Sequence, residues 1–144
     1  MKINLAFWDT SAIVPLCCFQ ATSQKLRELR RKYEVVAWWA SPIEGQSALK
    51  RLLRDNEISQ TAYYEAVKRL EIQSETWREI LPTEKVRELA KNLIETQKLR
   101  TLDALQLAAA LVWCFEKPKG RIFICCDDKL SEAAEKIGFT ILPK

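Results

Sequence analysis

The chain has 144 residues, which is enough for one compact domain and too few for two independent cores, so we expect a single domain over residues 1–144. Hydrophobic residues make up 48% of it and charged residues 29%, with three glycines and five prolines, so disordered, collagen-like and low-complexity chains are excluded. The formal net charge of +4 mildly favours a polyanionic partner.

Short apolar runs alternate with helical patterns along the chain. In order, we predict a strand at Ile3–Trp8, a helix at Thr22–Lys32, a strand at Val35–Ala40, a helix at Pro42–Arg54 capped by Ser41, and a helix from the polar break Asp55–Ser59 to Glu71. The second half follows with a strand at Trp77–Leu81, helices at Glu84–Gln97 and at Leu102–Phe115 capped by Thr101, a strand at Arg121–Cys126, a helix at Lys129–Ile137 ended by Gly138, and a strand at Phe139–Leu142. This alternation predicts an α/β fold, a three-layer α/β/α sandwich with a mostly parallel central sheet.

Nothing in the sequence indicates a membrane-spanning segment or a protein held together by disulfide bonds. The longest strictly apolar run, Leu107–Phe115, is well short of the roughly 20 residues that span a bilayer, and the residues from Lys2 to Asp9 do not resemble a signal peptide. The five cysteines are an odd number and include no C-x-x-C spacing, so neither a disulfide framework nor structural zinc is indicated. We therefore expect a cytoplasmic protein that makes no membrane contact.

The chain contains no histidine. It therefore lacks the usual side-chain general base at neutral pH, and Ser-His-Asp, Cys-His and histidine-pair ribonuclease mechanisms are excluded. If the protein is a hydrolase, the remaining chemistry is a set of carboxylates that hold a hard cation.

Four acidic residues occupy positions that suit such a site. Asp9 and Asp127 follow predicted strands, whereas Glu44 and Asp103 lie in the first turns of predicted helices. Groups just beyond the carboxyl ends of parallel strands line the crevice where ligands bind. Clustered carboxylates repel one another unless a cation neutralises them, and oxygen ligands suit Mg²⁺ or Mn²⁺. Each acid alone is better explained as a helix cap or a partner of a helix dipole, and it is the combination of four acids in a histidine-free chain that favours a site.

Four segments together resemble one protein family. They are F-W-D-T-S-A at residues 7–12, S-P-I-E-G-Q-S-A-L-K-R-L at 41–52, L-R-T-L-D-A-L-Q-L-A-A-A at 99–110 and C-C-D-D-K-L-S-E-A-A-E-K-I-G at 125–138. In this order and spacing they look like the PIN-domain family, and within it the VapC-type toxin ribonucleases of prokaryotic toxin–antitoxin pairs.

The resemblance implies an endoribonuclease that depends on Mg²⁺ or Mn²⁺, cuts RNA, forms a homodimer and binds a cognate antitoxin protein. It implies catalytic roles for Asp9, Glu44, Asp103 and Asp127. Asp9, Asp103 and Asp127 would hold the metal, with Glu44 as a further ligand or a base that orients water. Ser11 matches the hydroxyl residue that the family has two positions after its first acid.

Two departures from the family pattern leave alternatives open. Cys125 stands where the family often has Ser or Thr, and Gln106 stands where a histidine is frequent. A non-catalytic module that binds RNA or a partner protein therefore stays open, as does a DNA nuclease or phosphatase on the same carboxylates.

Two finer expectations concern single residues. On the helix Pro42–Arg54, Arg51 shares a stripe with Glu44 and Ser47, so it would either flank the acidic site and bind a substrate phosphate or belong to a solvated face. The family pattern places its fourth acid three residues before a leucine, which selects Asp127 for the crevice and leaves Asp128 to cap the following helix.

Overall fold

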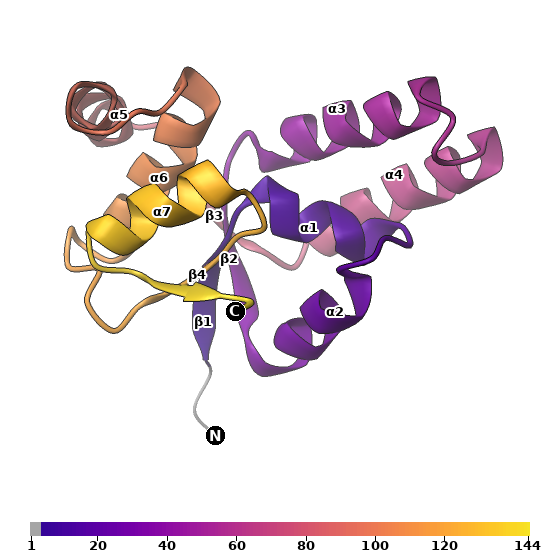
Figure 1. The fold of residues 1–144 in the computed structure, drawn as a ribbon, viewed down its shortest axis with the longest axis horizontal. Coiled ribbons are helices and arrows are strands. Elements are labelled where there is room, and N and C mark those ends of the chain that lie inside the picture. The colour runs from indigo at the N-terminus through magenta and orange to yellow at the C-terminus, as the bar shows by residue number, and fades with distance from the viewer. Residues whose placement is uncertain (1–3) are drawn as a thin grey trace.

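A parallel sheet forms the centre of the computed structural model, which describes residues 4–144 (Figure 1). Within that range the sheet has five strands, namely β1 (Leu5–Trp8), β2 (Glu34–Trp38), β3 (Arg78–Ile80), β4 (Ile122–Ile124) and β5 (Thr140–Leu142). Their order is β3-β2-β1-β4-β5, and every neighbouring pair is parallel. All five strands were predicted, although Ile3, where we expected the first to begin, lies outside the described residues.

Helices cover both faces of this sheet. The described residues form seven of them, namely α1 (Thr10–Cys17), α2 (Ser23–Lys32), α3 (Ser41–Arg54), α4 (Gln60–Ser74), α5 (Glu84–Thr96), α6 (Thr101–Trp113) and α7 (Asp128–Lys136). Helices α1 to α4 share one hydrophobic cluster with the sheet, and α5 to α7 share the other. The two groups lie on opposite sides of the strands in Figure 1. The predicted three-layer α/β/α sandwich is confirmed.

The strands alternate between these two clusters. Phe7 and Val36 pack with α5 to α7, whereas Ala6, Trp8 and Val35 pack with α1 to α4. Successive strand side chains point to opposite faces, and here both faces are buried. This double burial explains why the strands are almost continuously apolar in the sequence instead of alternating with polar residues.

Helix α1 was not predicted. Its sequence, TSAIVPLC, contains Pro15 and is buried at nearly every position, so it lacks the polar face by which an amphipathic helix is recognised. Asp9 caps it, because the Asp9 side chain accepts a hydrogen bond from the Ser11 N–H. The same acid that we assigned to a site therefore also begins a helix.

The N-caps of α3 and α6 each lie one residue before the predicted cap. Ala40 rather than Ser41 is the N-cap of α3, and Arg100 rather than Thr101 is the N-cap of α6. Neither cap residue provides a side-chain hydrogen bond, and the Ser41 hydroxyl is instead fully buried and accepts a bond from Gln106. At the end of α7, Gly138 adopts a φ of +120°, as expected for a glycine that terminates a helix.

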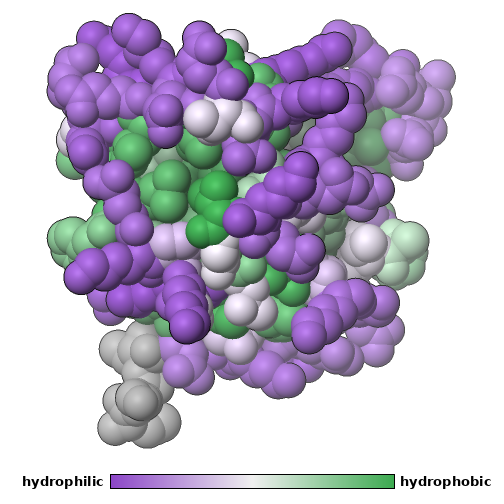
Figure 2. All heavy atoms as spheres, turned by 60° about the vertical axis from the view of Figure 1, so that its left-hand side comes forward, coloured by the Kyte–Doolittle hydropathy of each residue, from purple (hydrophilic) through white to green (hydrophobic). Residues whose placement is uncertain are grey.

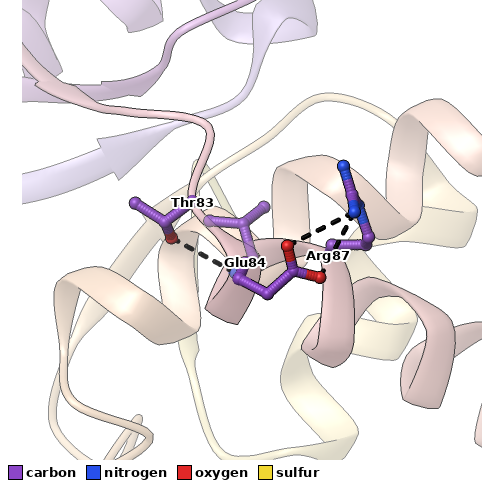
Figure 3. Close-up of polar contacts among 4 residues, drawn as sticks. Thr83, Glu84 and Arg87 are labelled. Atoms are coloured by element: carbon purple, nitrogen blue, oxygen red, sulfur yellow. Dashed lines mark hydrogen bonds and ion pairs between the residues drawn. The ribbon is translucent and has the colours of Figure 1, made fainter.

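Local contacts fix the start of α5 (Figure 3). The Thr83 hydroxyl accepts a hydrogen bond from the Val86 N–H at 3.4 Å, and the Nη1 atom of Arg87 lies 3.3 Å from the Glu84 carboxylate. Behind this start, Val86 and Leu89 pack in the same cluster as the apolar face of α6. No helix within residues 4–144 is both long and apolar enough to cross a membrane.

Candidate acidic site

The site lies where the order of the sheet reverses. From β1 the chain continues to β2 and β3 on one side, and it later returns to place β4 and β5 on the other side. The carboxyl ends of β1 and β4 therefore flank a topological switch point, where open α/β sheets bind ligands. Asp9 directly follows β1, and Asp127 lies in the turn that follows β4.

One pocket of about 560 Å³ occupies this switch point. The residues that we singled out from the sequence and that line it are Asp9, Ser11, Glu44, Ser47, Arg51, Asp103 and Asp127. The structure thus brings together all four acids from four separate segments of the chain. Asp55 and Glu57, which we had assigned only to a polar break, also line the wall beside Arg51.

Asp9 is the most buried of the four acids, with 5% of its surface exposed. Its Oδ2 accepts hydrogen bonds from the Ser11 hydroxyl at 2.6 Å and from the Ser11 N–H at 3.1 Å. The Ser11 hydroxyl in turn accepts a bond from the Cys126 N–H at 2.9 Å, so it ties Asp9 to the turn after β4. Burial raises the pKa of Asp9, and the bonds from Ser11 oppose this shift.

Cys125 contacts the same oxygen. Its Sγ lies 3.6 Å from Asp9 Oδ2 and 3.7 Å from the Ser11 hydroxyl. Burial, followed by the charge of Asp9, raises the pKa of the Cys125 thiol to about 12, so the thiol stays protonated and donates. The cysteine therefore keeps a weak donor at the position where the family often has a hydroxyl.

Glu44 is held by a buried amide. Gln106, which is 1% exposed, places its Nε2 3.4 Å from both Glu44 carboxylate oxygens, 3.0 Å from the Thr10 hydroxyl and 3.1 Å from the Ser41 hydroxyl, so its two N–H hydrogens are shared among four acceptors. Burial raises the pKa of Glu44 to about 7, the charge of Asp9 adds to the shift, and the bonds from Gln106 and Thr10 oppose it. Gln106 thus belongs to the site, although the sequence analysis noted it only as a departure from the family pattern. The available signal was a lone polar side chain on an apolar helix.

Asp103 lies between opposing charges at the start of α6. Burial raises its pKa, and the carboxylates of Asp127 and Asp9 raise it further. Lys129 and Arg100 oppose this shift from the other side. Asp103 therefore joins the acidic pocket to a basic part of the surface.

The prediction that Asp128 caps the last helix is wrong, whereas Asp127 lines the pocket as expected. Asp127 caps α7, because its Oδ1 accepts a hydrogen bond from the Leu130 N–H at 2.9 Å, and Asp128 is an exposed residue of the first turn. Strand β4 ends at Ile124, so both acids lie beyond the strand and the alternation of strand side chains does not determine which of them faces the pocket. Asp127 both lines the pocket and caps the helix.

The donor set fits a hard cation. The pocket offers carboxylate and hydroxyl oxygens, which suit Mg²⁺ or Mn²⁺. Within residues 4–144, no three His, Cys, Asp or Glu side chains lie close enough to one another to enclose an ion. Mg²⁺ is usually held by one or two carboxylates and keeps several waters, so an ion in this pocket would reach some of the four acids through bound water.

The fold and the site define an α/β/α protein with a carboxylate pocket at its switch point. No protein-family model matches the chain, and no curated protein sequence matches it. Among solved structures, the chain is similar to one described as a toxin–antitoxin complex from Klebsiella pneumoniae, with 17% sequence identity and a TM-score of 0.64. The match covers 86% of this chain and 88% of that chain. At this level of identity, the likeness shows a shared fold.

The double role of Asp127 leads to a stability prediction. Asp127→Ala removes the cap of α7, whereas Asp127→Asn removes the charge and keeps a side chain that caps well. We expect the Asn variant to exceed the Ala variant by about 1 kcal/mol in free energy of unfolding, measured by urea denaturation without metal. Asp128→Ala serves as the control and should cost less than Asp127→Ala. Equal stability of the two Asp127 variants would show that the capping bond contributes nothing.

The raised pKa of Glu44 leads to a prediction about pH. Between its ordinary value of 4.5 and its folded value of about 7, the folded protein holds more protons on this group than the unfolded chain does. The stability linked to this carboxyl is therefore present at low pH and is lost as pH rises through about 7. The melting temperature of the metal-free protein should fall from about pH 5 to about pH 8, and Glu44→Gln should reduce that fall. Glu71→Gln, on an exposed face of α4, is the matched control and should keep the wild-type slope.

Proposed function

We propose that the protein is a cytoplasmic, metal-dependent endoribonuclease of the PIN-domain type and the toxin of a toxin–antitoxin pair. One observation carries the proposal, namely that carboxylates from the end of β1, from α3, from α6 and from the β4–α7 turn converge on one pocket of a histidine-free chain. The similarity in fold to a structure described as a toxin–antitoxin complex supports the biological context.

Asp9, Asp103 and Asp127 would hold Mg²⁺ or Mn²⁺, and Glu44 would act as a further ligand or as the base that orients the attacking water. When bound there, such a cation supplies charge neutralisation at the phosphodiester and a water of lowered pKa. Hydrolysis would leave a 5′-phosphate and a 3′-hydroxyl, as the family resemblance implies.

The other side chains act by positioning these groups. The two bonds from Ser11 hold one oxygen of Asp9 in place, and the Gln106 amide fixes the Glu44 carboxylate against the start of α3. Arg51 also lines the pocket, is exposed, and would bind a phosphate of the substrate. Its neighbours Asp55 and Glu57 limit the positive field on that side.

The decisive experiment is the removal of one pocket charge. Asp9→Asn should abolish metal-dependent cleavage of labelled RNA, because the charge that attracts the cation is removed while the residue can still cap α1. The assay compares RNA and DNA, each with Mg²⁺, Mn²⁺ or a chelator. Asp128→Asn, an exposed acid next to the pocket, is the control and should cleave like the wild type.

Each other result of this assay has a definite meaning. Full cleavage by Asp9→Asn at saturating metal would contradict the site. Binding of RNA by the wild type without any cleavage would favour the non-catalytic alternative. Cleavage of DNA in place of RNA would show that the protein is a DNA nuclease.

The proposal includes a homodimer and an antitoxin segment that lies across the acidic pocket. Large apolar side chains remain exposed on the single chain, among them Ile43 at 64% and Leu102 at 58%, both of which line the pocket. Exposed apolar surface of this kind is typical of interfaces. We expect light scattering at micromolar concentration to give the mass of two chains, and a monomer would contradict the assembly.

A further inference from the structure

Two shallow grooves continue from the acidic pocket toward α7. The first, of about 490 Å³, is bounded by the α5–α6 connection and by Lys129, and it reaches Asp103, which also lines the acidic pocket. The second, of about 400 Å³, shares the residues 96–99 and Lys129 with the first and extends along α7 to Lys136. Neighbouring hollows thus share lining residues, and the series leads from the acidic pocket to α7.

The charge of the lining residues changes from negative in the acidic pocket to positive in the two grooves. The cations of these grooves, which we call the basic track, are Lys98, Arg100, Lys129 and Lys136. All four are exposed, and none forms any of the ion pairs found within residues 4–144. Beyond Asp103, the acids that line these two grooves are Glu95 and Glu132. The track therefore keeps an excess of positive charge.

The basic track begins at the acidic pocket. Arg100 and Lys129 line the first groove together with Asp103, which also lines the acidic pocket, so their charges lie at the pocket mouth. On the other side of the pocket, Asp55 and Glu57 accompany Arg51. The positive field is thus concentrated on the α7 side. Figure 2 turns the part of the molecule with α5 and α7 toward the viewer and shows long hydrophilic side chains around an apolar strip.

A polyanionic strand needs such a surface in order to approach four carboxylates. The pocket itself repels phosphates until a cation occupies it, so most of the binding free energy must come from cations beside it. Lysine and arginine side chains contact phosphates without reading bases, which suits a strand of variable sequence. An open groove next to the pocket lets the flanking nucleotides lie extended.

We infer that the basic track binds the sugar–phosphate backbone of single-stranded RNA on one side of the scissile bond. This inference rests on the proposed ribonuclease function and adds to it the path of the substrate. It predicts that the strand leaves the pocket along the α5–α6 connection and α7, and not along α2, although α2 carries a denser run of basic residues.

The test measures RNA binding separately from cleavage. In the Asp9→Asn background, the double substitution Lys98→Gln and Lys129→Gln should weaken binding of a short unstructured RNA about tenfold, measured by fluorescence anisotropy with Mg²⁺. The slope of log affinity against log salt should become shallower by about 0.7 for each phosphate that the protein no longer neutralises. The control carries Lys25→Gln and Lys32→Gln, an equal charge change on exposed positions of α2, on the other face of the sheet. Its affinity should stay near that of the parent.

The outcomes separate this inference from the proposed function. If the track variant and the α2 variant bind RNA with equal affinity, whether both are weakened or both are unchanged, the inference about the basic track is overturned. This holds even if the wild type cleaves RNA. If the RNA does not bind the Asp9→Asn parent protein, the inference is overturned as well. The groove would then serve a protein partner. If the track substitutions weaken RNA binding but the wild type never cleaves RNA, the basic track is supported and the proposed ribonuclease function is refuted.

Discussion

The burial of carboxylates at one edge of the sheet is the constraint on which the arrangement of this protein depends. Asp9, Glu44 and Asp103 all have raised pKa values, burial being the largest cause in each case, and for Glu44 and Asp103 the neighbouring carboxylates add to the shift. A parallel sheet gathers such groups because its strand ends meet at one side, and helix starts from both layers can reach the same place. The fold thus brings the carboxylates together, and individual hydrogen bonds must offset the unfavourable free energy of burying them side by side.

Those contacts come from neutral donors. Ser11 donates to Asp9, Gln106 donates to Glu44, and the Leu130 N–H donates to Asp127. None of them carries a positive charge, so these contacts orient the carboxylates without neutralising them. A buried arginine would have neutralised the acids more simply, but it would have occupied the place of a ligand.

The sequence predicted most of the fold because the strands are apolar runs and most helices have an amphipathic period. Helix α1 was missed because burial on nearly all sides removes that period and Pro15 argues against a helix. The four acids were found because each ends a strand or begins a helix, which the chain order reveals. The role of Gln106 was not predictable, since it depends on α3 and α6 meeting near their starts. The capping by Asp127 was missed because β4 ends at Ile124, before the apolar pattern of the sequence ends.

The capping bonds of Asp9 and Asp127 also bear on ion selectivity. Each carboxylate commits one oxygen to its own helix start, Oδ2 in Asp9 and Oδ1 in Asp127, and within residues 4–144 the other oxygen accepts no hydrogen bond. Each acid is thereby arranged to coordinate through a single oxygen. Ca²⁺ favours bidentate carboxylates and a larger, more flexible set of ligands, whereas Mg²⁺ accepts single oxygens in an octahedron completed by water. In the proposed site, the first turns of α1 and α7 would therefore favour Mg²⁺ over the larger Ca²⁺.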